Sequence, residues 1–266
     1  MKLIHLATGL LAIGMVGASA AQELGASKSF EKALEAINAG DSSSAVKLLD
    51  ETIKADPKHA SAYYHRGREN FRLANMEQCV QDFDKYVELN PAVASRQWER
   101  GIALYYAGKF QAGADQFKLY QTYHDNDVEN SVWRYLCMAR ADKDTELARK
   151  AMLPIRNDRR VPMMQVYELY RGNLKPTEVL KAIEEAGGSA EQQAGRTFYA
   201  DLYLGLYYEA NGKHKLARKH LDKAADPKLG ESGHLNSYMW DVARIHVLLL
   251  KRAEIEAAKK SEDKPN

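Results

Sequence analysis

The amino-acid sequence predicts an all-α protein, a superhelical solenoid of helical hairpins with a C-terminal capping helix. The first observation is a repeat of 34 residues, in which "KADPKHASAYYHRG" at 54–67 returns as "ELNPAVASRQWERG" at 88–101. The second is composition, because Ala, Leu, Lys and Glu recur while Gly and Pro are sparse, which favours helices. Such a chain repeats itself because one hairpin cannot bury its own apolar face and the next hairpin buries it.

Each of the first three repeats is predicted to hold two amphipathic helices joined by a short turn. The expected helices are 27–39 and 43–54, 60–73 and 76–88, and 94–107 and 110–122. Small residues at fixed places let the paired helices approach, and large residues fill the space beside them; the pairs are Ala33 with Leu49, Gly67 with Phe83, and Gly101 with Phe117. Pro57 and Pro91 end successive repeats, since proline stops a helix.

The predicted organisation is regular over 26–125 and less regular after it. A degenerate repeat and a helical insert are expected over 126–190, with the insert broken at Arg171-Gly172-Asn173. A further repeat and the capping helix follow over 191–258, and the tail 259–266 is expected to be disordered. A terminal repeat needs such a cap because its stacking face would otherwise meet water.

The first twenty residues have the composition of a secretory signal peptide. A single Lys2 precedes an apolar run from Leu3 to about Gly17, and the small residues Ala18-Ser19-Ala20 follow. The run falls short of the roughly 20 residues of a membrane span. We expect cleavage after Ala20 or Ala21 and a soluble protein that is exported to the periplasm or secreted.

The repeat resembles the tetratricopeptide repeat (TPR) family, whose period is 34 residues with small, aromatic and proline positions in this order. Three repeats in phase from about 26 to 125 carry the resemblance, and "RTFYADLYLGLYYEANGKHKLARKHLDKAADP" restores it after the insert. The resemblance implies a protein-binding module in which the first helix of every repeat lines a concave groove.

The insert "VYELYRGNLKPTEVL" and the later "FYADLYLGLYYEANGKHKLARKHLDKA" are similar to the NlpI-like family of bacterial periplasmic lipoproteins. That resemblance implies a non-catalytic, homodimeric adaptor that docks a tail-specific periplasmic protease to its substrates and associates with enzymes of peptidoglycan turnover. The lipidated cysteine of that family is absent here, because Ala20-Ala21-Gln22 stands in its place. Membrane anchoring is therefore not expected.

The sequence offers little for catalysis or for cofactors. The eight histidines include no pair at i, i+4 and no His-Glu-x-x-His, so a metal site is not expected. No phosphate-binding glycine motif occurs, and "GESGH" at 230–234 lacks the order of a nucleophile elbow. The net charge of +2 is too small to indicate a nucleic-acid-binding protein. We expect no enzyme activity, no cofactor and no metal.

The predicted protein-binding site is the groove face of the first helices in the second and third repeats. Aromatic faces beside guanidinium groups suit an acidic or aromatic peptide segment. The candidate residues are Tyr64, Arg68, Phe71, Arg72, Trp98, Ile102, Tyr105 and Tyr106. Packing between repeats is the alternative for each aromatic, although Tyr105 and Tyr106 are adjacent and we expect at least one to face out.

Three further features have a structural and a functional interpretation. The aromatics Tyr199, Tyr203, Tyr207, Tyr208, Tyr238 and Trp240 are expected in a thick core, with dimerisation or a partner contact as the alternative. The basic run "RNDRR" at 156–160 is expected to be a solvated loop, with an acidic partner as the alternative. Cys79 is expected in the core, and a bridge to Cys137 is not expected.

Taken together, the sequence predicts an exported protein-binding adaptor or scaffold. The alternative is a structural subunit of a multiprotein envelope assembly, for which the stacking surfaces matter more than the groove.

Overall fold

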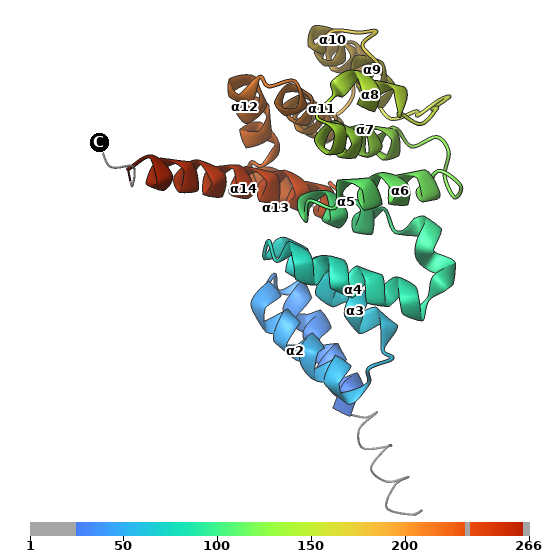
Figure 1. Ribbon diagram of the computed structural model, residues 1–266, viewed down its shortest axis with the longest axis vertical. Helices are drawn as coiled ribbons and strands as arrows, with labels where there is room; N and C mark the ends of the chain where they lie inside the picture. Colours follow the sequence, from blue (N-terminus) through green and yellow to red (C-terminus); the bar gives the residue numbers. More distant parts are fainter. Residues whose placement is uncertain (1–24, 232–234, 263–266) are drawn as a thin grey trace, which may run out of the picture. The chain divides into compact units, whose positions relative to one another are not determined.

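The computed structural model describes residues 25–231 and 235–262. Every regular element in these residues is a helix, which confirms the all-α class (Figure 1). The predicted signal peptide and residues 263–266 of the predicted tail lie outside the described residues, whereas residues 259–262, which the sequence assigns to the tail, are helical. No helix in the described ranges is both long and apolar enough to cross a lipid bilayer.

The chain divides into two compact units, Met1–Pro91 and Ala92–Asn266. In the first unit a helix over residues 25–38 is followed by α2 (Ser42–Ala55), α3 (Ala60–Arg72) and α4 (Met76–Leu89). These helices match the predicted ones to within two residues at each end. The boundaries predicted for the repeat block, the insert and the tail stay predictions.

The second unit contains the remaining helices. They are the 3-10 helix η1 (Pro91–Arg96, which begins at the last residue of the first unit), α5 (Trp98–Tyr106), α6 (Phe110–Tyr120), α7 (Val128–Asp142), α8 (Thr145–Lys150), α9 (Met163–Tyr170), α10 (Pro176–Ala186), α11 (Ala190–Ala210), α12 (His214–Ala224), α13 (Pro227–Glu231) and α14 (Ser237–Glu262). The degenerate repeat thus has two helices, and the insert has two helices broken where the sequence predicts the break.

The pairs of small and large residues position the helices as predicted. A Cβ atom added to Gly67 would lie 3.2 Å from the ring of Phe83, and one added to Gly101 would lie 2.6 Å from that of Phe117. Real Cβ contacts are rarely so short. The absence of a side chain at each glycine therefore lets the aromatic ring of the second helix pack directly against the backbone of the first. In the first hairpin, Ala33 and Leu49 are fully buried in one apolar cluster.

The paired helices also share a polar contact at equivalent places. Arg66 on α3 donates two hydrogen bonds to the carboxylate of Asp82 on α4, from Nε at 3.1 Å and from Nη2 at 2.6 Å to Oδ1. Thirty-four residues later, Arg100 donates to Oε1 of Gln116 at 2.7 Å. The repeat therefore conserves the position of a contact while its chemistry changes from an ion pair to a neutral hydrogen bond.

The third repeat departs from the prediction at its start, because residues 94–107 do not form one α-helix. The chain makes the 3-10 helix η1 over Pro91–Arg96, and α5 begins only at Trp98. Gln97 has a non-helical backbone at φ −85° and ψ 63°. The Ala94 carbonyl accepts the Gln116 side-chain amide at 2.8 Å and the Gln97 backbone amide at 3.5 Å, at the end of η1.

Cys79 and Cys137 are reduced thiols and fully buried, which confirms both expectations about them. The capping helix α14 is the longest described helix, and residues 251–260 of it are exposed on every face.

Candidate protein-binding surfaces

The face of α3 carries three of the predicted groove residues at the surface of the first unit. Tyr64, Arg68 and Arg72 are half-buried, with 22% of the Arg72 side chain exposed. Phe71, predicted beside them, is fully buried and presents no surface. A Phe on a helix of this kind contributes most when it packs in the core, and its burial corrects the prediction for this residue.

Neighbouring side chains fix the aromatic and basic groups of this face. Arg68 Nη1 donates to the Tyr64 hydroxyl at 3.3 Å, and the guanidinium lies 5.8 Å from the centre of the Tyr64 ring. Residues four apart face the same side of a helix, so this pair forms within α3. The Tyr64 ring packs on Tyr86 of α4 at 5.1 Å, and Arg72 donates to buried Glu69 at 2.7 Å. The face therefore offers a flat ring beside two guanidiniums.

The groove prediction is wrong for Ile102 and Tyr105 on α5. Ile102 is fully buried and Tyr105 is 5% exposed. The Tyr105 ring packs at 5.4 Å on Trp133 of α7 and at 5.6 Å on Phe110 of α6. Because α5 lies between these helices and the cap, its apolar side chains form the core of the second unit.

Trp98 and Tyr106 both contact the protein's own C-terminal helix, α14. The Trp98 ring meets that of Tyr238 edge-on at 5.3 Å. The Tyr106 hydroxyl lies 2.9 Å from Nδ1 of His246, and its ring meets His246 at 5.7 Å. Both are half-buried. Of the adjacent pair, Tyr105 is buried and Tyr106 keeps part of its surface exposed, so the expectation that one of them faces outward is met only in part, because α14 contacts Tyr106.

His246 also contacts an acid on α11. Its Nε2 lies 2.8 Å from Oε2 of Glu209. Burial of Glu209 opposes ionisation, but the contact and the charge of His246 outweigh it and hold the pKa of Glu209 below its ordinary value. A cavity of about 330 Å³ lies beside this contact and includes Arg140 and Leu250 in its wall.

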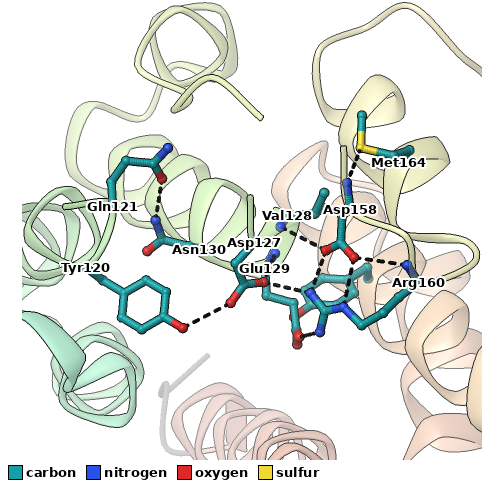
Figure 2. A network of polar contacts seen from close by, with 10 residues as sticks. Tyr120, Gln121, Asp127, Val128, Glu129, Asn130, Asp158, Arg160 and Met164 are labelled. Carbon is teal, nitrogen blue, oxygen red and sulfur yellow. Dashed lines mark hydrogen bonds and ion pairs between the residues drawn. The ribbon is translucent and has the colours of Figure 1, made fainter. Parts of the chain in front are cut away.

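A second polar cluster joins α7 to the loop before α9 (Figure 2). Arg160 contacts three carboxylates at once. Its Nη1 lies 2.5 Å from Glu129 Oε2, and its Nη2 lies 2.7 Å from Asp127 Oδ1 and 2.6 Å from Asp158 Oδ2. Asp158 also accepts from the Val128 amide at 3.2 Å, which ties the loop to the first turn of α7.

This cluster corrects the prediction that "RNDRR" is only a solvated loop. Asp158 is 7% exposed, and Arg160 bonds internally although 47% of its side chain is accessible. Arg156, Asn157 and Arg159 are exposed as predicted. Burial and the charge of Asp127 raise the pKa of Glu129, and Arg160 opposes them.

The C-terminal aromatics belong to the core only in part. Tyr203 and Tyr238 are buried, and Tyr199, Tyr207, Tyr208 and Trp240 are half-buried. Tyr170 of the insert donates to the Tyr203 carbonyl at 2.8 Å and packs on Tyr207 at 5.3 Å. The insert and the later repeat therefore share one aromatic core.

The first unit has the features of a known repeat: hairpins of paired helices, small residues against large ones, and left-handed turns at Gly40 and Ala74. Residues 30–94 match the family model of the tetratricopeptide repeat. The match includes α2, α3 and α4, and therefore the α3 face described above.

Two solved structures are similar to this chain at low sequence identity. One, described as "MamA RS-1 ArsTM double mutant", is 14% identical, covers 78% of this chain and 96% of its own, and gives a TM-score of 0.45. The other is the C-terminal part of a TPR repeat-containing protein from Cytophaga hutchinsonii. It is 16% identical, covers 82% of this chain and 72% of its own, and gives a TM-score of 0.41.

The TPR match indicates a protein-interaction module, and the α3 face is the part of the predicted site that lies at the surface of the matched segment. Sequence reasoning did not find the Arg160 cluster. The spacing Asp127-x-Glu129 before an apolar run and the basic residues after Pro154 were the only signals, and neither shows that the two segments meet.

Proposed function

We propose that the chain is a non-catalytic adaptor that binds a partner protein through the face of α3. The observation that carries this proposal is the position of Tyr64, Arg68 and Arg72 at the surface of a segment that matches the tetratricopeptide repeat. Arginine guanidinium groups suit a carboxylate, which they can hold in two parallel hydrogen bonds. The chemistry fits an acidic or aromatic segment of the partner.

The mechanism is an increase in effective concentration. An adaptor that holds an enzyme and its substrate together converts their second encounter into an intramolecular one, and no bond is broken by the adaptor itself. By resemblance to the NlpI-like family, the partner is a tail-specific periplasmic protease or an enzyme of peptidoglycan turnover. The proposal includes export, based on the composition of residues 1–20, and a homodimer.

The experiment is capture of partners from the exported fraction of the native host, with the chain from Ala21 as bait. The test variant is Arg68→Ala, because Arg72 pairs with buried Glu69 and Trp98 packs on α14, so changing either would also disturb packing. The matched control is Arg156→Ala, which removes the same charge from an exposed position in the other unit.

We expect a protease or a cell-wall enzyme to bind the wild type and the control and to lose about tenfold or more in affinity for Arg68→Ala. Equal binding by all three proteins would move the contact away from α3. If only copies of the bait itself are recovered, the alternative role as a self-associating structural subunit is favoured. Light scattering of the purified chain would then measure the size of its assembly.

A further inference from the structure

A cavity in the second unit lies beside the Arg160 cluster. Its volume is about 180 Å³, and its wall includes Trp98, Asp127, Glu129, Asn130, Trp133 and Arg160. One water needs only about 15 Å³ by the same measure, so the cavity has room for a ligand group. It is separate from the α3 face, which belongs to the first unit.

The charge around this cavity is unbalanced. Three carboxylates, of Asp127, Glu129 and Asp158, share the single guanidinium of Arg160, which leaves a formal charge of −2 when all are ionised. Only 18% of the Asp127 side chain and 15% of the Glu129 side chain are exposed. Water therefore screens this excess poorly, and a second cation would relieve it.

Two tyrosine hydroxyls add hydrogen bonds to this cluster. The Tyr203 hydroxyl donates to Glu129 Oε1 at 2.6 Å, and the Tyr120 hydroxyl donates to Asp127 Oδ2 at 3.4 Å. The raised pKa of Glu129 agrees with this excess of negative charge, because burial and Asp127 both act against its ionisation.

Asn130 provides a second, independent observation that points to a ligand. Its side chain is 2% exposed, and its Oδ1 has no hydrogen-bond partner among the described residues. The orientation of the amide follows from its neighbour (Figure 2). Gln121 donates through Nε2 to the carbonyls of Asp125 and Pro154, so its Oε1 must accept, and it accepts from Asn130 Nδ2 at 2.9 Å. The unpaired atom is therefore an acceptor that needs a donor.

Trp133 adds a donor and an aromatic wall. Its Nε1 is also buried without a hydrogen-bond partner in the described part of the chain. The rings of Trp133 and Trp98 both line the cavity, and aromatic faces favour cations. A ligand with a cationic N–H group could donate to the carboxylates and to Asn130 Oδ1. A carbonyl oxygen of the same ligand could accept from Trp133 Nε1. A polypeptide supplies both groups.

We propose that this cavity binds a primary ammonium group of a partner polypeptide, with Asp127, Glu129 and Asn130 as its acceptors. The ammonium belongs either to a lysine side chain or to a free amino terminus, which share this chemistry. The proposal rests on the proposed protein-binding function only in assigning the ammonium to a protein partner.

The test uses small probes, so it does not depend on the natural partner. Nα-acetyl-lysine N-methylamide carries only the side-chain ammonium, and alanyl-alaninamide carries only the terminal one. Nα-acetyl-norleucine N-methylamide is the uncharged analogue. Binding to the full chain is measured by calorimetry and by tryptophan fluorescence, since two of the three tryptophans line the cavity.

The variants are Glu129→Gln, which removes one charge at constant shape, and Glu146→Gln, an exposed acid on α8 as the matched control. We expect at least one charged probe to bind the wild type and the control, and to bind Glu129→Gln about tenfold more weakly. The probe that binds identifies the lysine or the amino terminus. If Glu129→Gln does not fold by circular dichroism, Asp127→Asn takes its place.

Three outcomes would overturn the proposal: no heat or fluorescence change with either charged probe up to about 100 mM, equal binding by Glu129→Gln, or equally tight binding of the norleucine analogue. None of these outcomes contradicts the proposal for the α3 face, which is tested by partner capture with Arg68→Ala. Conversely, the capture experiment does not test whether the cavity binds an ammonium group.

Discussion

The hydroxyl of Tyr106 lies 2.9 Å from Nδ1 of His246, which is 140 residues further along the chain. Through this contact α14 is attached to α5, and through Glu209 the same histidine reaches α11. A helix that the sequence assigns to a cap therefore also covers the side of α5 that the repeat pattern assigns to a peptide groove.

Replacing Tyr106 by Phe tests how much this contact stabilises the second unit. The ring and its packing on Trp133 stay, and only the hydroxyl is lost, so we expect the free energy of unfolding to fall by about 1 kcal/mol. Urea denaturation measures it. Tyr123→Phe is the control, because that side chain is 54% exposed and should change stability little. Equal effects would mean that the Tyr106 hydroxyl bond adds nothing.

The pH dependence of stability should report Glu209. Its pKa is lower in the folded protein than the ordinary 4.5, so its ionised form contributes stability that is complete above pH 4.5 and lost as pH falls through the folded value. We expect Glu209→Gln to be less stable than the wild type at pH 7, with the difference shrinking as pH falls from 4.5. Urea midpoints between pH 7 and pH 3 measure this, and a difference independent of pH would contradict it.

Glycine at position 101 should be required by close packing. A methyl group there would lie 2.6 Å from the Phe117 ring, so we expect Gly101→Ala to lower stability by about 1–3 kcal/mol. Gly195 on α11 is the matched control, because among the described residues its added methyl would meet only Leu235, at 3.8 Å. The same substitution there should raise stability by about 0.5–1 kcal/mol. Thermal unfolding of both variants gives the sign directly.

The sequence could predict these hairpins because their determinants are local. Gly67 with Phe83 and Gly101 with Phe117 stand at fixed distances within one repeat, and the helix boundaries follow from them. It could not place Tyr106 against His246, since no periodicity links residues so far apart. Arg160 was missed for the same reason, because Asp127 and Glu129 lie at the start of α7, 33 and 31 residues earlier, and the run around Arg160 resembles a solvated loop.

A local signal can also mislead, and Gln116 is the example. It stands where the preceding repeat has Asp82, so the pattern predicts an equivalent helix before it. The amide can donate as well as accept, unlike a carboxylate, and it takes the Ala94 carbonyl. This contact lies where η1 ends and α5 begins, and a pattern based on apolar positions does not register it.

Ala74 should be a site where glycine stabilises the protein. It has φ 61°, whereas the equivalent turn positions are Gly40 at φ 76° and Gly108 at φ 73°. A left-handed conformation costs a residue with a Cβ about 1 kcal/mol. We therefore expect Ala74→Gly to raise the thermal midpoint, and Ala107→Gly, at an ordinary negative φ of −79°, to lower it. A lower midpoint for Ala74→Gly would show that the turn is not strained.

The two equivalent contacts between paired helices should differ in their cost of removal. Asp82 has 3% of its side chain exposed and depends on Arg66, so Arg66→Ala leaves a buried carboxylate without its guanidinium. We expect a loss of about 3 kcal/mol. Arg100→Ala leaves only a neutral amide, which still bonds the Ala94 carbonyl, and we expect about 1 kcal/mol.

Urea denaturation of both variants, and of Arg66→Met combined with Asp82→Leu, separates the value of the ion pair from the cost of breaking it. The double variant removes both charges and keeps most of the volume, so it should be more stable than Arg66→Ala alone. If Arg66→Ala and Arg100→Ala lose the same free energy of unfolding, leaving the Asp82 carboxylate without its arginine costs no more than leaving the Gln116 amide without its own. A double variant as unstable as Arg66→Ala would show that the ion pair itself stabilises the fold, because Met keeps most of the packing of the arginine stem and Leu leaves no buried charge unpaired.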